Sequence, residues 1–476
     1  MLFNSFNFLF IFLPLTFIIA IFLKKIDNVK LYILFLTISS LYFYSYFLTS
    51  YILILIGSIL LNFFYAKILL KLKAKKIRLF IFITIIIKNI IILIYFKYFN
   101  FLIENFNTIF DTNIYINNII LPLAISFFTF QQITFITSVY KDEIKDFQFI
   151  KYAFFICFFP QLIAGPIIKF KELYPQILKS LKFSMSERNL TIGLIIFSIG
   201  MFKKIVISSY LATIADPVFN NIDSNIIINP FDAWIGLIAF SFQIYFDFSG
   251  YTDMAIGLAC CLGFVLPINF YSPYKSSSIK EFWTNWHITL SRFLKSHIYI
   301  PLGGNKNSHF TQFKNIFITM LIGGIWHGAS WNFVLWGGYH GFLIIIEKIL
   351  KKIFSFKLPH FIYKYIIFLL ITIGWIPFRC QSIESIFFML NSLFSFNNFF
   401  HESLSSLFLL KFLIIFVIFL LIMFLPNSVQ IQKKIEDQFF SKTSIYLYLL
   451  ISFSLIFFLL VEPSENINKE FIYFQF

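Results

Sequence analysis

The stretch that decides the fold is residues 281–341, which read EFWTNWHITLSRFLKSHIYIPLGGNKNSHFTQFKNIFITMLIGGIWHGASWNFVLWGGYHG. Five of the chain's seven histidines lie here: His287, His297, His309, His327 and His340. Four of its seven tryptophans flank two of these histidines, with Trp283 and Trp286 beside His287 and Trp326 and Trp331 beside His327. The sequence on either side is almost unbroken hydrocarbon. Because polar side chains are costly inside a membrane, this stretch is predicted to be the functional centre.

The composition around this stretch is that of an all-α polytopic membrane protein. Of the 476 residues, 59% are hydrophobic and 13% are charged, a balance that no soluble globular domain has. The formal net charge of +16 does not indicate nucleic acid as a partner, because the basic residues lie in short loops between apolar segments. Such loops set the orientation of membrane helices and favour contact with anionic lipid headgroups.

The four cysteines, Cys157, Cys260, Cys261 and Cys380, lie in or beside apolar segments. None has metal-ligand spacing, and the adjacent Cys260 and Cys261 are poorly placed to pair with each other, so all four are predicted to be packing residues. The sequence also contains no Walker-type phosphate loop, no GxSxG nucleophile elbow and no plausible metal site.

Apolar segments of about the length that a bilayer requires recur along the chain. They are predicted at residues 6–23, 31–48, 51–66, 79–99, 119–139, 192–214, 233–248, 361–378, 407–424 and 445–461. Basic residues follow the first and third of these spans, whereas the loop after the fourth carries Glu104 and Asp111 and no Lys or Arg. The positive-inside rule then places the N-terminus and the C-terminal tail outside and the basic loops, including residues 141–151, in the cytoplasm.

Two segments break this pattern. Residues 152–168 contain FFPQLIAGPI, whose prolines and glycine prevent a single straight helix and suggest a re-entrant segment enclosed by protein. Asp247 and Asp253 lie in an otherwise apolar segment and are expected to cap broken helices or to pair with a buried Arg or Lys, for which Arg379 is a candidate. In all, eleven to thirteen membrane-embedded helices are predicted. The sequence shows no internal repeat, which weakens a transporter interpretation.

Several blocks resemble those of the membrane-bound O-acyltransferase (MBOAT) family. They are YFDFSGYTDMAIGL, FYSPY…FWTNWHITLSRFL, YIPLGGN, GGIWHGASWNFVLWGGYHG and the terminal FIYFQF. The similarity is greatest to the bacterial branch that O-acetylates alginate and peptidoglycan, and it extends over nearly the whole chain. We therefore expect one integral membrane domain over 1–476, with N-terminal spans in 1–140, a catalytic core in 150–350, and C-terminal spans and an outer tail in 361–476.

The resemblance implies a ring of tilted helices around a thinned centre, where a narrow tunnel joins a cytoplasmic and an outer funnel. It implies that His327, in IWHGASW, matches the invariant family histidine at that tunnel, and that His287, in NWH, matches a second family position held by histidine or asparagine. The family passes an acyl group from a cytoplasmic donor to an acceptor on the far side. Acetyl-CoA is therefore the expected donor substrate, and no permanently bound cofactor is expected.

The side-chain chemistry agrees with these roles. Imidazole accepts and returns a proton near neutral pH, as deprotonation of an attacking hydroxyl requires. His327 is the predicted base, and His287 orients it or stabilises the oxyanion. Small residues such as Gly324 and Gly328 are expected to leave room for the thioester arm, and the Arg292 guanidinium suits a donor phosphate. The predicted substrate-contacting or tunnel-lining residues are Asn285, Trp286, Arg292, Trp326, Trp331 and His340.

Simpler interpretations of the same residues stay open. An intramembrane histidine between tryptophans can be a hydrogen-bonding residue between helices, which applies to His287 and to His327. His340 either packs against the centre or takes part in catalysis. His297 and His309 are predicted to be loop or interface residues. Because His287 and His327 are forty residues apart, only tertiary folding can bring them to one site.

The terminal FIYFQF resembles the C-terminal motif of the small partner subunit in the related teichoic-acid D-alanylation system. In that light Tyr473 is a candidate acyl acceptor, whose hydroxyl a histidine would activate before the group passes to a periplasmic protein. The alternative is an aromatic residue that holds the tail at the membrane interface.

Together these patterns predict an acyltransferase of the cytoplasmic (inner) membrane that exports acetyl groups for O-acetylation of an extracytoplasmic polysaccharide, either peptidoglycan or an alginate-like polymer. The resemblance implies a separate periplasmic SGNH-type transferase or esterase as partner, since no span-free region of this chain is long enough to fold as such a domain. Two alternatives stay open. One is transfer of D-alanyl or another acyl group to teichoic acid, lipid or protein, and the other is a non-enzymatic transporter or flippase.

Overall fold

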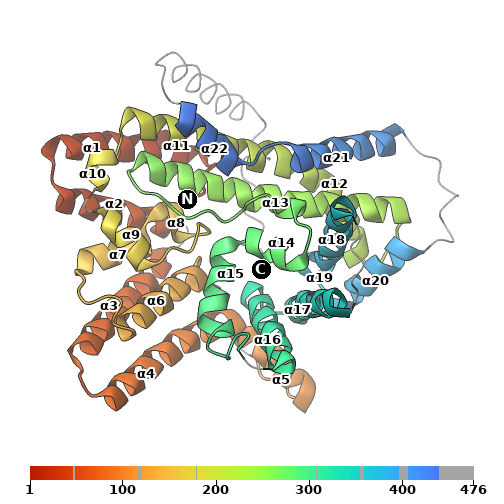
Figure 1. Ribbon diagram of the computed structural model, residues 1–476, viewed down its shortest axis with the longest axis horizontal. Helices are drawn as coiled ribbons and strands as arrows, with labels where there is room; N and C mark the ends of the chain where they lie inside the picture. Colours follow the sequence, from red (N-terminus) through yellow and green to blue (C-terminus); the bar gives the residue numbers. More distant parts are fainter. Residues whose placement is uncertain are drawn as a thin grey trace. The chain divides into compact units, whose positions relative to one another are not determined.

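The computed structural model describes residues 1–46, 49–115, 119–177, 179–306, 308–353, 359–395 and 406–438, and it is helical throughout (Figure 1). No strand occurs in these ranges. The helices group into two compact units. Met1–Met201, Tyr251–Ile268 and the described residues from Gln432 onward form the first unit, and Phe202–Gly250 with Asn269–Ile431 form the second.

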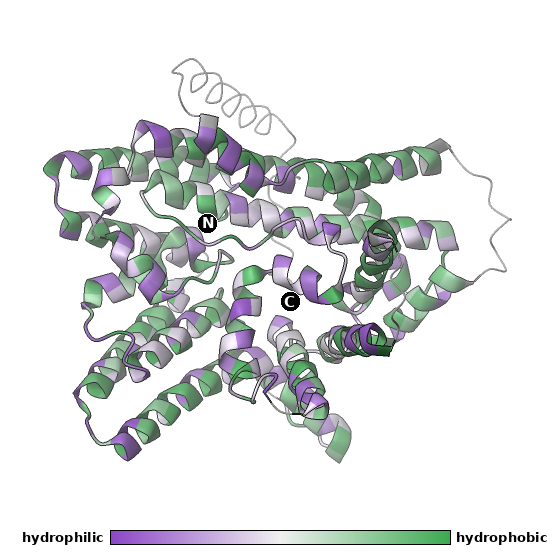
Figure 2. Cartoon of the chain, in the orientation of Figure 1, coloured by the Kyte–Doolittle hydropathy of each residue, from purple (hydrophilic) through white to green (hydrophobic). Residues whose placement is uncertain are grey.

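The first unit holds the N-terminal helices. They are η1 (Asn7–Phe12), α1 (Leu13–Ile26), α2 (Val29–Ser45), α3 (Thr49–Lys71), α4 (Lys75–Leu93), η2 (Ile94–Tyr98), α5 (Phe99–Phe110), α6 (Ile125–Tyr140), α7 (Phe149–Cys157), α8 (Phe159–Leu162), α9 (Phe170–Ile177), α10 (Ser180–Phe183) and α11 (Glu187–Met201). Figure 2 shows α3 and α4 hydrophobic along most of their length and hydrophilic where they join, as expected for two spans linked outside the hydrocarbon.

The second unit contains the histidine-rich stretch. Its helices are η3 (Phe202–Ser208), α12 (Ser209–Asp223), η4 (Pro273–Lys275), α14 (Ile279–Asn285), α15 (Ile288–Leu294), η5 (Lys295–Tyr299), α16 (His309–His327), α17 (Trp331–Ile353), α18 (His360–Gly374), α19 (Ile376–Arg379), α20 (Ile383–Phe394) and α21 (Ser406–Phe424). Two further helices, α13 (Pro230–Cys261) and α22 (Ser428–Gln438), each contribute residues to both units.

The predicted class, an all-α polytopic membrane protein, is confirmed. Within the described ranges, six helices are long and apolar enough to cross a membrane, or seven if the bent pair Leu409–Phe424 and Ser428–Asp437 counts as one span. Shorter apolar helices, including α2, add to these. The predicted span at 119–139 starts later, since α6 begins at Ile125 and has 16 residues. The predicted span at 445–461 lies outside the described residues.

The interruption predicted at residues 152–168 is confirmed. Helix α7 ends at Cys157, α8 is a single turn, and the chain then turns at Gly165, where an added Cβ would lie 2.4 Å from the Gln161 Cα atom. Every residue from 152 to 168 is buried. This agrees with the principle that broken backbone is tolerated at membrane depth where protein surrounds it.

Helix α13 corrects one prediction. The predicted span at 233–248 is part of one continuous 32-residue helix, so Asp247 and Asp253 do not cap a helix break. The alternative prediction, pairing with a buried Arg or Lys, is confirmed for Asp247: its carboxylate pairs with the Lys204 ammonium at 2.5 Å, and 95% or more of each side chain is buried. Pairing satisfies two charges that would each be costly alone in this interior.

Arg379 does not serve as the cation for these aspartates. Its guanidinium donates to Asp216 on α12 at 3.3 Å and lies over the Phe219 ring. The expected pairing of Arg379 with Asp247 or Asp253 is therefore wrong, because α19 ends beside the partly exposed carboxylate of α12.

Candidate active site

His287 occupies a strained position between two short helices. Ser278 caps the start of α14 by accepting from the Glu281 N–H, and α14 ends at Asn285. His287 then adopts a left-handed conformation, with φ of 42°, before α15 begins at Ile288. For a residue other than glycine such a conformation costs roughly 1–3 kcal/mol, and it persists where the surroundings impose it.

Asn269 supplies much of that constraint. Its backbone carbonyl accepts from the Ile288 N–H at 3.0 Å, and its side-chain Oδ1 accepts from the Thr289 hydroxyl at 2.6 Å and the Thr289 N–H at 3.3 Å. Asn269 is fully buried. These bonds tie the first two residues of α15 to Asn269, and so fix the position of the adjacent His287.

His327 ends the long helix α16, which lies against α17 (Figure 1). The two helices approach closely because glycines meet: an added Cβ on Gly324 would lie 2.2 Å from the Phe333 carbonyl oxygen, and one on Gly337 would lie 2.5 Å from the Met320 carbonyl oxygen. Small residues at a helix crossing let two backbones pack in contact. The crossing holds the His327 side chain, which is 5% exposed, against α17.

One tryptophan contacts both predicted catalytic histidines. The centroid of the Trp326 indole lies 5.9 Å from that of the His287 ring and 4.9 Å from that of the His327 ring, both edge-on. The contacts continue from His327 to Trp336 at 4.9 Å and from Trp336 to His340 at 4.9 Å. We call these five residues the histidine–tryptophan cluster. Folding therefore brings His287 to four side chains that follow it by 39 to 53 positions (326 − 287 and 340 − 287).

His340 is the innermost histidine of the cluster, with no exposed surface. Its ring is edge-on to Trp283 at 4.9 Å as well as to Trp336. It also presses on α18, since an added Cβ on Gly374 would lie 2.7 Å from the His340 Nε2 atom. Neither ring nitrogen has a hydrogen-bond partner within the described ranges. The contacts of the His340 ring are packing contacts. They also leave its buried ring nitrogens available to a substrate.

The electrostatic surroundings keep His287 neutral. Burial lowers its pKa, because a charged imidazolium would lose its hydration among the rings of Phe248 and Trp326. His287 lies between α14 and α15, outside the candidate spans. A neutral imidazole carries one N–H donor and one acceptor nitrogen, and neither finds a hydrogen-bond partner among the residues described.

The other predicted residues are placed as follows. Trp286 is buried and packs against Phe270 and Trp375, with centroids 5.0 and 4.9 Å away. Asn285 donates to the Ser276 hydroxyl at 3.4 Å. Half-buried Arg292 lies in the last turn of α15, and Trp331 begins α17 with 53% of its side chain exposed. Tyr473 lies outside the described residues. Their roles in binding or catalysis stay predictions.

The glycines near His327 do not leave the open space that the sequence suggested. An added Cβ on Gly328 would lie 2.0 Å from the Phe333 ring, and the space beside Gly324 is filled by α17. These positions are small because helices and an aromatic ring press on them. Room for a thioester arm next to His327 therefore does not come from Gly324 and Gly328.

Sequence reasoning missed three aromatic residues and Asn269. Trp336 and Phe378 contact His327, with centroids 4.9 and 5.2 Å away, and Phe248 contacts His287 at 4.8 Å. Trp336 was accessible from the sequence, because it stands four residues before His340 on the same helix face. Nothing in the sequence pairs Phe378 with a histidine 51 positions earlier (378 − 327).

The described residues define a multi-pass helical membrane protein in which two buried histidines contact one tryptophan. The family model described as MBOAT, membrane-bound O-acyltransferase family, matches residues 38–389, which is more than half of the chain. The chain belongs to this family and is an acyltransferase, as its sequence motifs predict.

Two similar proteins cover most of the chain. The peptidoglycan O-acetyltransferase of Helicobacter pylori is 39% identical over 414 residues, covering 81% of this chain and 78% of that protein. The probable alginate O-acetylase AlgI of Pseudomonas aeruginosa is 36% identical over 413 residues, covering 83% of this chain and 75% of that protein. A teichoic acid D-alanyltransferase of Streptococcus thermophilus is less similar, at 27% over 253 residues, 48% of this chain and 58% of that protein.

Proposed function

We propose that this protein transfers acetyl groups across the cytoplasmic (inner) membrane for O-acetylation of an extracytoplasmic polysaccharide, either peptidoglycan or an alginate-like polymer. The observation that carries the proposal is the shared contact of His287 and His327 with Trp326. Similarity to a peptidoglycan O-acetyltransferase and a probable alginate O-acetylase over about four-fifths of the chain supports the acyl group and the acceptor class.

In this proposal His327 acts as the general base. It takes the proton of an attacking hydroxyl, whose oxygen bonds to the carbonyl carbon of the acetyl thioester. The carbon–sulfur bond then breaks, the thiolate leaves and receives the proton, and an acetyl ester and free coenzyme A thiol result. The neutral His287 ring donates its N–H to the carbonyl oxygen as negative charge develops there. The surrounding aromatic rings exclude water, which would otherwise hydrolyse the thioester.

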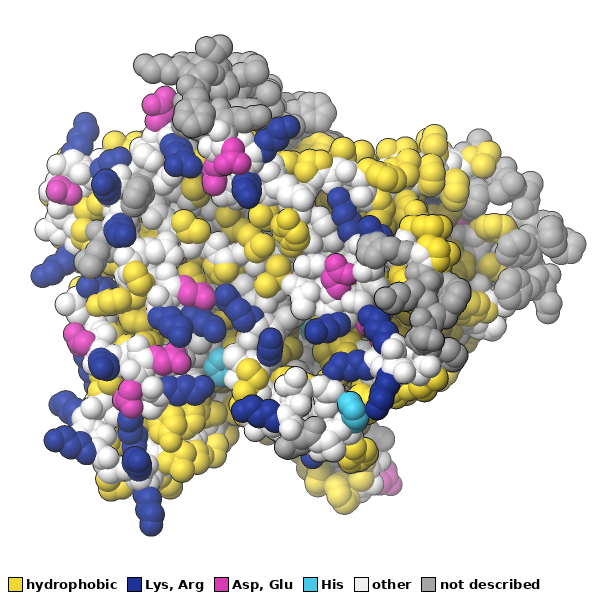
Figure 3. Space-filling view, viewed as in Figure 1, with side chains coloured by type: hydrophobic (Ala, Val, Ile, Leu, Met, Phe, Trp, Pro, Cys, Tyr) yellow, Lys and Arg dark blue, Asp and Glu magenta, His cyan; other side chains and the backbone are white. Residues whose placement is uncertain are grey.

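The same proposal assigns the donor and the orientation. Acetyl-CoA is the donor, reaching the site from the cytoplasm, with Arg292 suited to its phosphates. Basic loops face the cytoplasm, and the N-terminus and C-terminal tail face outward. On the face drawn in Figure 3, Lys and Arg side chains clearly outnumber Asp and Glu side chains, in line with the net charge of +16. A periplasmic SGNH-type transferase or esterase would complete delivery to the sugar hydroxyl.

Tyr473 is the proposed first acceptor of the acetyl group. Its phenol becomes nucleophilic when a histidine removes the proton, and the acetyl ester formed on it then passes to the partner. Removal of residues 471–476 should abolish acetyl export while the protein still accumulates in the membrane. Full export by the shortened protein would exclude Tyr473 from the reaction.

The central test is the O-acetyl content of purified cell-wall and secreted polysaccharide in a strain carrying His327→Ala. Loss of a positioned general base lowers the rate by roughly two to four orders of magnitude, so the acetate of one polymer should fall to background. The polymer that loses acetate identifies the acceptor. Immunoblots of membrane fractions show whether the variant accumulates as the wild type does.

Two other outcomes would overturn the proposal. Unchanged acetate in every polymer, with the variant present at the wild-type level, would remove His327 from catalysis and favour a transporter. Loss of D-alanyl ester with acetate unchanged would assign the chain to D-alanyl transfer, the activity named for its Streptococcus thermophilus relative.

A further inference from the structure

A pocket opens where α2 and α7 begin. Its volume is about 330 Å³, and both helices contribute their first residues, Val29 on α2 and Phe149 on α7. The two helices pack against each other within the first unit. Its described lining residues are Val29, Lys30, Ile33, Gln148, Phe149, Ile150, Lys151 and Ile177.

The charged side chains of this pocket all carry one sign. Lys30 and Lys151 line it, and none of the lining residues described above is acidic. The Lys151 ammonium lies 5.1 Å from the centre of the Tyr174 ring, which holds it at the rim. The nearby Asp146 is engaged elsewhere, since its carboxylate accepts from the Phe147 N–H at 2.8 Å and pairs with Lys67 at 3.5 Å. The pocket therefore presents two cations without a matching carboxylate among its lining residues.

The remaining wall is apolar and continues onto exposed hydrocarbon. Ile33 and Ile177 form buried parts of the wall, while Phe149 and Ile150 are 41% and 39% exposed. Along α2 the exposed apolar surface continues through Leu34, which is 39% exposed. On a membrane protein such surface faces lipid tails. Two lysines beside an apolar wall thus stand at a boundary between headgroups and hydrocarbon.

We propose that this pocket binds one anionic phospholipid, whose phosphate lies between Lys30 and Lys151 and whose acyl chain follows Ile33, Phe149 and Ile150. Basic pockets at the membrane boundary select anionic headgroups. Both helices also begin here, and the positive ends of their dipoles favour a negative charge further. A small phosphate compound would satisfy the lysines alone, whereas the phospholipid also covers the apolar wall.

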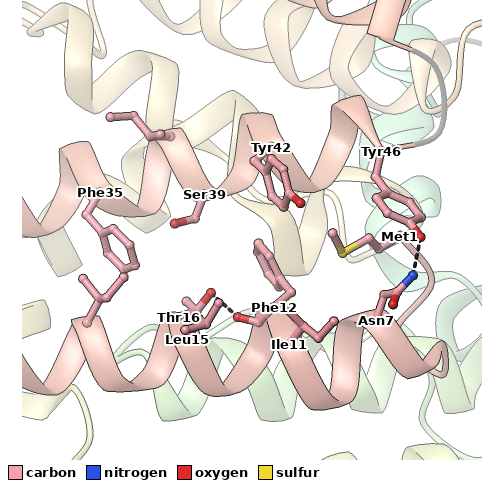
Figure 4. Close-up of a pocket in the computed structure, with 12 residues that line it drawn as sticks. Met1, Asn7, Ile11, Phe12, Leu15, Thr16, Phe35, Ser39, Tyr42 and Tyr46 are labelled. Carbon is pink, nitrogen blue, oxygen red and sulfur yellow. Dashed lines mark hydrogen bonds between the residues drawn. The ribbon is translucent and has the colours of Figure 1, made fainter.

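A second cavity, which shares α2 with the first, provides a contrast. Figure 4 shows it between η1–α1 and α2, with a volume of about 540 Å³. Its polar side chains are neutral: Asn7 donates to the Tyr46 hydroxyl, and Thr16 donates to the Phe12 carbonyl oxygen at 2.7 Å. The lining residues described include no Lys or Arg. Of these two cavities, the lysine pocket is the one that offers side-chain cations to an anionic lipid.

The test is native mass spectrometry of the detergent-purified full chain titrated with phosphatidylglycerol or phosphatidylethanolamine. The wild-type protein should retain phosphatidylglycerol in preference to phosphatidylethanolamine. Each lysine near a membrane surface contributes about fivefold in affinity for an anionic lipid, so Lys30→Gln/Lys151→Gln should bind phosphatidylglycerol roughly thirtyfold more weakly. Its binding of phosphatidylethanolamine should not change. The exposed single variant Lys30→Gln should lose about fivefold.

A matched variant controls for total charge. Lys75→Gln/Lys76→Gln removes two exposed lysines at the start of α4 and should keep the wild-type preference. An equal loss in this control would overturn the proposal, because the preference would then reflect net charge. Binding of glycerol phosphate as tightly as phosphatidylglycerol would also overturn the proposal. Glycerol phosphate lacks acyl chains, so the pocket would then be a site for a free phosphate compound. Phe149→Ser should weaken the binding of phosphatidylglycerol and leave the binding of glycerol phosphate unchanged.

Discussion

His287 combines two unfavourable features at one residue. It holds a left-handed backbone conformation, and neither nitrogen of its buried ring has a hydrogen-bond partner within the described part of the chain. An unsatisfied buried polar group costs roughly 1–3 kcal/mol, in addition to the backbone strain. Such costs concentrate at functional sites, where the residue is held ready for a ligand. The contact with Trp326 places these features beside His327.

The first prediction concerns the chemical role of His287. If its ring donates to the developing oxyanion, His287→Ala should lower the rate of acetyl transfer by about 100- to 1,000-fold, as removal of one such donor does elsewhere. His287→Asn supplies an amide N–H at the same position and should retain more activity than the alanine variant. The activity of both variants is measured as the transfer of labelled acetyl groups from acetyl-CoA by isolated membranes. Equal activity of the alanine and asparagine variants would assign His287 to packing.

The second prediction concerns Asn269 as a positioning residue. Asn269→Ala removes the acceptor for both Thr289 donors, so His287 should lose its fixed place and activity should fall at least tenfold. Thr289→Val removes the hydroxyl bond and leaves the Thr289 N–H bonded to Asn269, so its effect should be smaller. Rates are compared at saturating donor, with thermal stability in detergent measured for each protein. Wild-type activity of a folded Asn269→Ala protein would contradict the positioning role.

At the scale of helices, the residue pattern predicted which helices exist better than it predicted where they begin and end. Apolar length alone located the spans that became α3, α18 and α21. Apolar length could not show that α13 continues past Asp247. The Asp247 carboxylate is neutralised there by Lys204 of η3, which is distant in sequence. The meeting of His287 with Trp326 likewise depends on the path of α16, which no spacing in the sequence encodes.

The third prediction separates two adjacent glycines of α17. An added Cβ on Gly337 would lie 2.5 Å from the Met320 carbonyl oxygen, whereas the nearest atom to one on Gly338 lies 3.7 Å away. Gly337→Ala should therefore force α16 and α17 apart and destabilise the protein by roughly 1–3 kcal/mol. Gly338→Ala should be neutral or slightly stabilising, because alanine favours the helix. Melting in detergent measures both, and equal melting temperatures would show that the helices do not cross at Gly337.

At the scale of the whole molecule, the sequence predicted the class and the order of spans in the first unit. Basic loops and apolar length are local properties, and they alternate in the order that the helices later follow. The grouping of residues 251–268 with the N-terminal helices was not predictable from local pattern, since it divides α13 between two units. The predicted internal division at 1–140, 150–350 and 361–476 stays a prediction.

The fourth prediction concerns the side of the membrane on which the basic loops lie. The chain passes from the loop at Lys73, through the helical segment Lys75–Phe110, to Asp111, and returns through α6 to the loop at Lys145. In a background without the native cysteines, Asp111→Cys should react with a membrane-impermeant maleimide in intact cells. Lys73→Cys and Lys145→Cys should react only after the membrane is opened, because the positive-inside rule predicts that the basic loops lie in the cytoplasm. The reverse pattern would put these loops outside, and acetyl-CoA could then not reach its site from the basic face.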